Sequence, residues 1–189
     1  MAHILVVGGT GLLRPLVKAL IEIGNDVSVL ATTASGFERL RLDITQMEQQ
    51  RMHPCIVDYR NLEQLSQAVD LAIKERGALS TGIAWVHSDA IETDKIIFDD
   101  VYNDQPNFRY FKILGSSVDD PSRNSVDSNI QSQPLLSSNY RRVVLGFILE
   151  GETSRWLTND EISQGILEAI EKDQTQFTVG VTRPWSLRP

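Results

Sequence analysis

The sequence predicts an α/β fold in which helices cover both faces of a mostly parallel sheet of about seven strands. Short apolar runs that suit buried strands alternate with longer segments of helical periodicity, and a glycine-rich turn ends the first of these runs. A strand, a helix and a second strand in this order form a right-handed unit with parallel strands. Several such units in succession predict a doubly wound sheet.

The first part of the chain contains five predicted strands with helices between them. Asn61 is a suitable N-cap for one of these helices, and Gly77 is a suitable end for it. Gly24 and Asn25 end an earlier helix in the same way. Strands are expected at 3–7, 27–31, 55–57, 82–86 and 108–114, and helices at 12–23, 37–51, 62–76 and 90–101.

The alternation breaks after residue 115. Residues 115–139 are rich in serine and contain prolines and aspartates, which predicts a long loop. The sixth strand, at 142–149, follows without a preceding helix, so an antiparallel pairing of this strand is allowed. Thr158 and Glu161 form a capping box for a helix that runs to about Ile170, and a last strand is expected at 177–181. We expect one domain over 1–189, with a core in 1–117, the loop 115–139 and a strand–helix–strand unit in 140–189.

Composition excludes several classes of protein. The chain has 189 residues and a formal net charge of −7, and it has no run of Lys or Arg that would indicate a nucleic-acid binder. No apolar segment approaches the ~20 residues of a membrane span. The only cysteine, Cys55, excludes an internal disulfide, and the three histidines are not at metal-ligand spacing. We therefore expect a cytoplasmic protein with no metal, no nucleic acid and no membrane partner.

The sharpest feature is the turn Gly8-Gly9-Thr10-Gly11, which stands between the first strand and the first helix. A dinucleotide pyrophosphate binds backbone N–H groups at the positive end of a helix, and glycines let the phosphate approach because no Cβ is in the way. The turn is therefore interpreted as a dinucleotide-binding site in a Rossmann-like domain. The alternative is a glycine turn that only joins strand to helix.

At this point the sequence resembles the short-chain dehydrogenase/reductase superfamily. The segment Val7-Gly8-Gly9-Thr10-Gly11-Leu12-Leu13 is similar to the turn of its extended and atypical members, and Asp58 stands where that superfamily often has an aspartate near the adenine. The resemblance covers about residues 1–117 as an order of elements. The whole chain, including its end Thr182-Arg183-Pro184-Trp185, also resembles a group of short bacterial Rossmann-fold proteins of that superfamily.

The chain departs from the family pattern at Arg14, which replaces the third glycine of the turn. Its side chain can contact phosphate, narrow the site, or lie solvated on the first helical turn. Together, the turn and the resemblance imply the following cofactor-binding residues: Gly8, Gly9, Thr10, Gly11, Leu12, Leu13, Arg14, Thr32, Thr33, Arg39, Asp58, Tyr59, His87 and Ser88.

The end of the second strand bears on which dinucleotide binds. NAD-preferring sites often place an acid there, whereas this chain has Thr32 and Thr33 and, slightly later, Arg39. Hydroxyl groups and a cation suit a 2′-phosphate better than a carboxylate would. We favour NADP over NAD, with an ordinary Ser/Thr loop and an exposed arginine as the alternative.

The family's catalytic Tyr-x-x-x-Lys pattern does not carry over to this chain. Tyr140 is followed by Arg141 and Arg142 and opens a predicted strand, so neither the lysine nor the carrier helix is present. Catalytic residues thus stay unknown, and the weak candidates are His87, Ser116 and Ser117. His87 is suited to acid/base work near neutral pH, but it can equally bind the cofactor or the backbone.

Three functions remain open at this stage. The first is an atypical NAD(P)-dependent oxidoreductase, the second is a non-catalytic module that senses a nicotinamide dinucleotide, and the third is a scaffold without cofactor. The expected partners are the dinucleotide and an unknown small-molecule substrate. The apolar sixth strand and the tail around Trp185 also suggest a homodimer surface.

Overall fold

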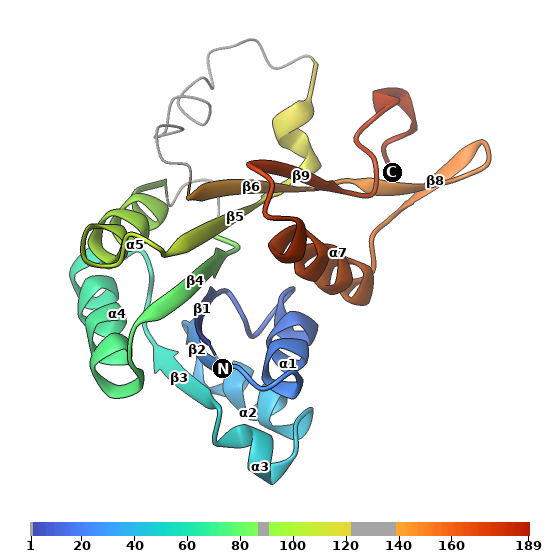
Figure 1. The fold of residues 1–189 in the computed structure, drawn as a ribbon. Coiled ribbons are helices and arrows are strands. Elements are labelled where there is room, and N and C mark those ends of the chain that lie inside the picture. The colour runs from blue at the N-terminus through green and yellow to red at the C-terminus, as the bar shows by residue number, and fades with distance from the viewer. Residues whose placement is uncertain (1, 87–90, 122–138) are drawn as a thin grey trace. The chain divides into compact units, whose positions relative to one another are not determined.

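A computed structural model of the chain describes residues 2–86, 91–121 and 139–189. It contains a seven-stranded parallel sheet in the order β3-β2-β1-β4-β5-β6-β9 and a separate two-stranded sheet of β7 and β8 (Figure 1). This confirms the predicted Rossmann-like α/β fold. The order 3-2-1-4-5-6 reverses direction between β1 and β4, which is the topological switch point of doubly wound folds.

The chain divides into two compact units, Met1–Tyr110 and Phe111–Pro189. The boundary falls inside β5. The expectation of one domain over 1–189 stays a prediction, and each unit is described by itself below.

The first unit is built on four parallel strands that are mostly buried. Every residue of β1 is buried, which explains why its sequence is a continuous apolar run rather than an alternating one. β1 pairs in parallel with β2 on one side and with β4 on the other, and β2 pairs in parallel with β3. The strands are β1 His3–Val7, β2 Asp26–Ala31, β3 Met52–Ile56 and β4 Leu79–Ala84.

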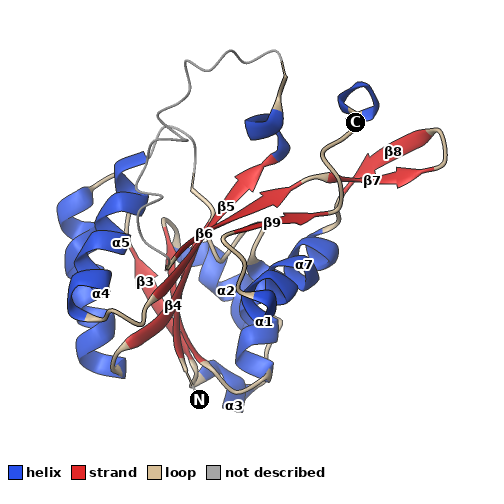
Figure 2. Cartoon of the chain, turned by 45° about the horizontal axis from the view of Figure 1, so that its top comes forward, coloured by secondary structure: helices blue, strands red, loops and turns tan. Residues whose placement is uncertain are grey.

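Helices of the first unit lie on both faces of these strands. Figure 2 shows α4 and α5 on one face and α1 and α2 on the other. The predicted helix at 37–51 is divided in two, because Thr45 is extended and starts a new helix with its own capping box to Glu48. The helices are α1 Arg14–Glu22, α2 Ala34–Leu42, α3 Gln46–Gln49, α4 Leu62–Arg76 and α5 Ile91–Asp104.

The end signals of α4 confirm the sequence interpretation. The side chain of Asn61 accepts a hydrogen bond from the backbone N–H of Gln64, and Gly77 ends the helix with a φ of 86°. At such a φ a residue with a Cβ is strained. The capping box of Thr158 and Glu161 is also present, at the start of α7.

In the second unit, the predicted sixth strand at 142–149 is two strands. β6 pairs in parallel with β9, whereas β7 pairs antiparallel with β8, so the antiparallel pairing allowed for this segment occurs only in its second part. The break is at Gly146, where a Cβ would collide with the backbone carbonyl of Val181. The strands and helices are β5 Arg109–Gly115, η1 Ser116–Asp119, β6 Tyr140–Leu145, β7 Phe147–Glu150, β8 Thr153–Trp156, α7 Asn159–Lys172, β9 Gln176–Val179 and η3 Trp185–Leu187.

The predicted loop at 115–139 begins with the short helix η1, and its residues 122–138 lie outside the described residues. Over the described ranges, no helix is long and apolar enough to cross a membrane. The same ranges contain no group of three or more His, Cys, Asp or Glu side chains placed to hold a metal ion.

Candidate functional site

The glycine turn takes the backbone course that its sequence predicts. Gly8 has a φ of 81°, and a Cβ at this position would lie 2.6 Å from the backbone oxygen of Trp85. A Cβ on Gly9 would lie 2.8 Å from the side chain of Val29. These two glycines therefore serve the close packing of β1, β2 and β4.

Gly11 differs from its neighbours. Of the atoms that the structure describes, a Cβ built on it meets only the oxygen of Gly8, at 4.0 Å, and its φ is not positive. Packing and backbone conformation thus leave this position free to carry a side chain. An open space beside a bare backbone is what a phosphate-binding turn requires.

The helix that follows the turn begins without a cap. No side chain in the ranges 2–86, 91–121 and 139–189 accepts a hydrogen bond from the first turn of α1, and this turn contains no acidic residue. The backbone N–H groups of Thr10, Leu12 and Leu13 have no hydrogen-bond acceptor among the described residues. By contrast, α3, α4 and α7 are capped by Thr45, Asn61 and Thr158 respectively. The N-terminus of α1 thus presents unsatisfied donors together with the positive end of the helix dipole.

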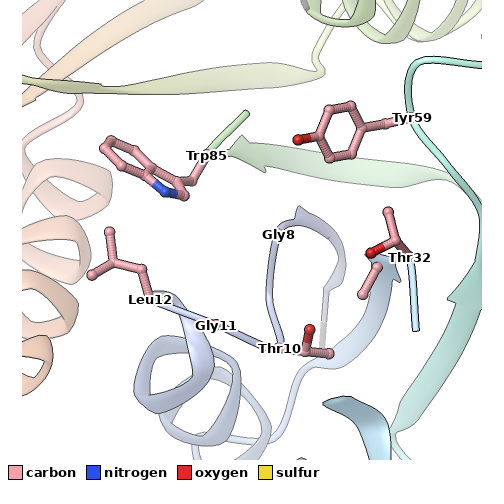
Figure 3. Close-up of a pocket in the computed structure, with 8 residues that line it drawn as sticks. Gly8, Thr10, Gly11, Leu12, Thr32, Tyr59 and Trp85 are labelled. Carbon is pink, nitrogen blue, oxygen red and sulfur yellow. The ribbon is translucent and has the colours of Figure 1, made fainter. Parts of the chain in front are cut away.

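A pocket of about 230 Å³ lies at this turn. The residues that line it lie at or after the carboxyl ends of all four strands of the first unit, and the pocket is therefore at the switch point between β1 and β4. Figure 3 shows the turn at Gly8 with the indole of Trp85 on one side and the ring of Tyr59 above Thr32 on the other. The lining residues are Gly8, Thr10, Gly11, Leu12, Ala31, Thr32, Tyr59 and Trp85.

The two aromatic residues of the pocket are held by the backbone. The hydroxyl of the fully buried Thr93, in α5, donates a 2.9 Å hydrogen bond to the carbonyl oxygen of Tyr59. The backbone N–H of Trp85 donates to the carbonyl oxygen of Val7 at 3.1 Å, which extends the pairing of β4 with β1. Their rings therefore project from fixed points on either side of the turn.

Six of the predicted cofactor-binding residues are brought together in the pocket, namely Gly8, Thr10, Gly11, Leu12, Thr32 and Tyr59. Sequence reasoning did not identify Ala31 or Trp85 as lining residues. Trp85 follows directly after β4, so its position at a carboxyl strand end was the available signal.

Other predicted residues have different surroundings. Leu13 is buried in the core, with 1% of its surface exposed. Arg14 forms an ion pair with Asp43 at 3.0 Å, so its guanidinium is directed to that carboxylate. The carboxylate of Asp58 accepts a 3.0 Å hydrogen bond from the backbone N–H of Arg60 and shapes the loop after β3.

Thr33 and Arg39 belong to the segment that follows β2. Thr33 is the N-cap residue of α2, and Arg39 is exposed on that helix. Neither residue lines the pocket. The predicted residues His87 and Ser88 lie outside the described residues.

The serine candidates for catalysis are in the second unit. Ser116 is buried and accepts a 2.9 Å hydrogen bond from the guanidinium Nε of Arg188. Ser117 belongs to the same short helix η1 and is partly exposed. Tyr140, the tyrosine weighed against the family pattern, begins β6 and is thus on a strand.

Two described titratable groups outside the pocket, His3 and Cys55, have pKa values shifted by burial. Burial lowers the pKa of His3, whose Nδ1 donates to the carbonyl oxygen of Gly77 and whose Nε2 accepts from the hydroxyl of Ser28, each at 2.8 Å. The carbonyl oxygen can only accept, so Nδ1 carries a proton, and because burial lowers the pKa of His3 the ring is neutral at neutral pH and its Nε2 is left to accept from Ser28. Burial also raises the pKa of the Cys55 thiol to about 11, which makes it a poor nucleophile at neutral pH.

Comparison with solved structures identifies the fold. The chain is similar to a short-chain dehydrogenase/reductase from Serratia marcescens, with a TM-score of 0.72, 13% identity and coverage of 95% of this chain and 96% of that one. It is also similar to the citronellol catabolism dehydrogenase of Pseudomonas aeruginosa, with a TM-score of 0.72, 15% identity and coverage of 95% and 93%. A third similar structure is the actinorhodin polyketide ketoreductase with NADPH, with a TM-score of 0.71, 12% identity and coverage of 95% of each chain.

The chain therefore has the fold of the short-chain dehydrogenase/reductases over nearly its whole length. No protein-family model and no curated protein sequence matches it.

The geometry of the turn predicts effects of different size on stability at two of its glycines. Gly8→Ala should lower the free energy of unfolding by about 1–3 kcal/mol, because it combines a positive φ with a collision against Trp85. Gly11→Ala should change it by no more than about 0.5 kcal/mol. Urea denaturation followed by circular dichroism measures the free energy of unfolding of each variant. Equal losses of this free energy in the two variants would contradict the description of the turn.

Proposed function

We propose that this protein binds a nicotinamide dinucleotide at the glycine turn and acts as an atypical NAD(P)-dependent oxidoreductase. The observation that carries the proposal is the uncapped N-terminus of α1, whose free N–H groups adjoin a pocket lined by Gly8 and Gly11. A diphosphate supplies the acceptors and the negative charge that this helix end lacks.

The described residues fit the nucleotide. The space beside Gly11 is the cradle that a Cβ would fill, and Tyr59 and Trp85 provide aromatic surfaces at its margins. Thr32 follows β2, where the ribose next to the adenine lies in Rossmann-type sites. The pocket of about 230 Å³ is smaller than the ~300 Å³ at the lower limit of ligand pockets, so it suits a part of a dinucleotide around the diphosphate.

Binding should depend on the bare backbone at Gly11. In a W156F/W185F variant, Trp85 is the one remaining tryptophan of the three in the chain and reports on its own pocket. Titration with NADPH and NADH should change the fluorescence of Trp85. The Gly11→Ala substitution should weaken nucleotide binding at least about tenfold and leave the free energy of unfolding unchanged. Thr45→Ala, which removes the cap of α3, serves as the control, because it should lower stability and leave binding unaltered. Two titrations without any change in fluorescence would instead support the scaffold without cofactor.

The hydroxyl groups and the cation after β2 favour NADP over NAD within this proposal. Arg39 has an exposed guanidinium, whereas Arg41 on the same helix is paired with Glu38 at 2.8 Å. Arg39→Gln should weaken NADPH binding about tenfold and leave NADH binding unaltered, because only NADPH carries the 2′-phosphate. Arg41→Gln is the matched control. Equal effects of Arg39→Gln on both nucleotides would remove the preference for NADP.

The bound nicotinamide would supply the hydride for a carbonyl substrate. We expect NADPH oxidation with at least one member of a panel of aldehydes and ketones. Tyr140→Phe should leave this rate unchanged, because Tyr140 is on β6 and the Tyr-x-x-x-Lys arrangement is missing. Binding without turnover of any carbonyl would favour the alternative, a non-catalytic sensor of nicotinamide dinucleotides. This alternative is supported by Ser116, whose hydroxyl is occupied by Arg188 rather than by a tyrosine–lysine pair.

The cytoplasmic location and the homodimer remain parts of the proposal. The side chains of Leu149, Trp156 and Val181 in the second unit are exposed by 40%, 46% and 37%, which is consistent with an apolar surface for a second copy.

A further inference from the structure

The C-terminal tail fixes one arginine against the segment that follows β5. The side-chain Nε of Arg188 donates a 2.9 Å hydrogen bond to the hydroxyl oxygen of Ser116, the first residue of η1. The tail itself is anchored to the β7–β8 hairpin, because the hydroxyl of Ser154 donates to the carbonyl oxygen of Leu187. All of these residues belong to the second unit.

Two indole rings hold the guanidinium group of Arg188. Its central carbon is 4.7 Å from the ring centroid of Trp156 and 5.1 Å from that of Trp185. Cation–π contacts of this kind stabilise a planar guanidinium and fix its orientation. The conformational entropy of a long side chain is therefore lost before any ligand binds, so the group is preorganised for recognition.

Arg188 has no acidic partner among the described residues. In the same unit, Arg141 forms a bidentate ion pair with Asp173, and Arg155 bonds to both Glu150 and Glu161. The guanidinium of Arg188, by contrast, bonds only to the hydroxyl of Ser116 within the described ranges, which leaves the N–H groups of both its Nη atoms without an acceptor.

Ser116 has an unused donor as well. A hydroxyl group has one hydrogen to donate, and the oxygen of Ser116 accepts from Arg188 while its hydrogen has no acceptor in the described part of the chain. The side chain is buried, with 2% of the residue exposed, and an unsatisfied buried donor is unfavourable. Arg188 and Ser116 are thus adjacent donors, one charged and one neutral, and no Asp or Glu side chain pairs with either of them in the ranges that the structure describes.

We propose that Arg188 and Ser116 form a binding site for the carboxylate of a small organic acid. A guanidinium binds a planar carboxylate with two parallel hydrogen bonds, and Ser116 offers a third donor. The exposed ring of Trp156, at 46% of its surface, provides an apolar flank for the carbon skeleton of the acid. The inference does not depend on nucleotide binding, because its residues are all in the second unit.

The experiment uses benzoate and benzamide as matched probes of the full-length protein. The three tryptophans give three indole N–H signals in a ¹H–¹⁵N spectrum, which single Trp→Phe variants assign. Benzoate at millimolar concentration should shift the signals of Trp156 and Trp185, and neutral benzamide should shift them far less. A response of Trp85 to NADPH in the same sample tests the proposed function separately, so failure of one idea does not imply failure of the other.

Variants identify the group responsible for binding. Arg188→Gln should weaken benzoate binding at least about tenfold, and Arg188→Lys should give an intermediate loss because it keeps the charge but not the paired geometry. Arg183→Gln is the control, because among the described residues this second tail arginine donates only to the carbonyl oxygen of Asp119. This variant should bind benzoate as well as the unaltered protein does.

Three results would overturn the inference. They are equal shifts with benzoate and benzamide, equal losses in Arg188→Gln and Arg183→Gln, and inorganic phosphate binding more tightly than benzoate, which would exclude a carboxylate as the preferred anion.

Discussion

The N-terminus of α1 needs hydrogen-bond acceptors, and no part of the described chain supplies them. Gly8 and Gly9 bring the strands so close that no side chain fits between them, and the chain then enters α1 with the amides of Thr10, Leu12 and Leu13 unpaired in the described part of the chain. A cap such as those of α4 and α7 would satisfy these amides, but the first turn of α1 contains none. The same turn therefore allows the close packing of the strands and leaves the N-terminus of α1 without a cap.

Those parts of the fold that are encoded locally could be predicted from the sequence. The apolar runs gave the strands to within a few residues, and Asn61, Gly77 and Thr158 marked helix ends because caps act within one turn of the chain. The division at Gly146 could not be predicted, since its cause is the backbone of Val181, 35 positions later in the sequence. The run at 143–149 contains no charged residue, and such a sequence looks the same whether it forms one strand or two.

For the candidate site too, the sequence predicted the residues in local motifs and not the contacts between distant segments. The glycines were identified because they form a turn between a strand and a helix, Thr32 because it follows the second strand, and Tyr59 through the family resemblance at Asp58. The partner of Arg14 was not identified, because an ion pair with Asp43 depends on how α1 and the end of α2 meet. Similarly, no local signal places Arg188 against Ser116, since these two residues are 72 positions apart. Contacts between residues far apart in the sequence are therefore the part of the structure that the sequence did not predict.

Cys55 also has a practical consequence. With a pKa of about 11, its thiol is ionised in roughly one molecule in ten thousand at neutral pH, whereas an exposed cysteine with a pKa near ~8.5 is ionised in a few per cent. Maleimide dyes or spin labels would therefore react with a cysteine introduced at the surface and largely spare the native one. One label placed on each compact unit would allow the distance between the units to be measured in solution without first removing Cys55.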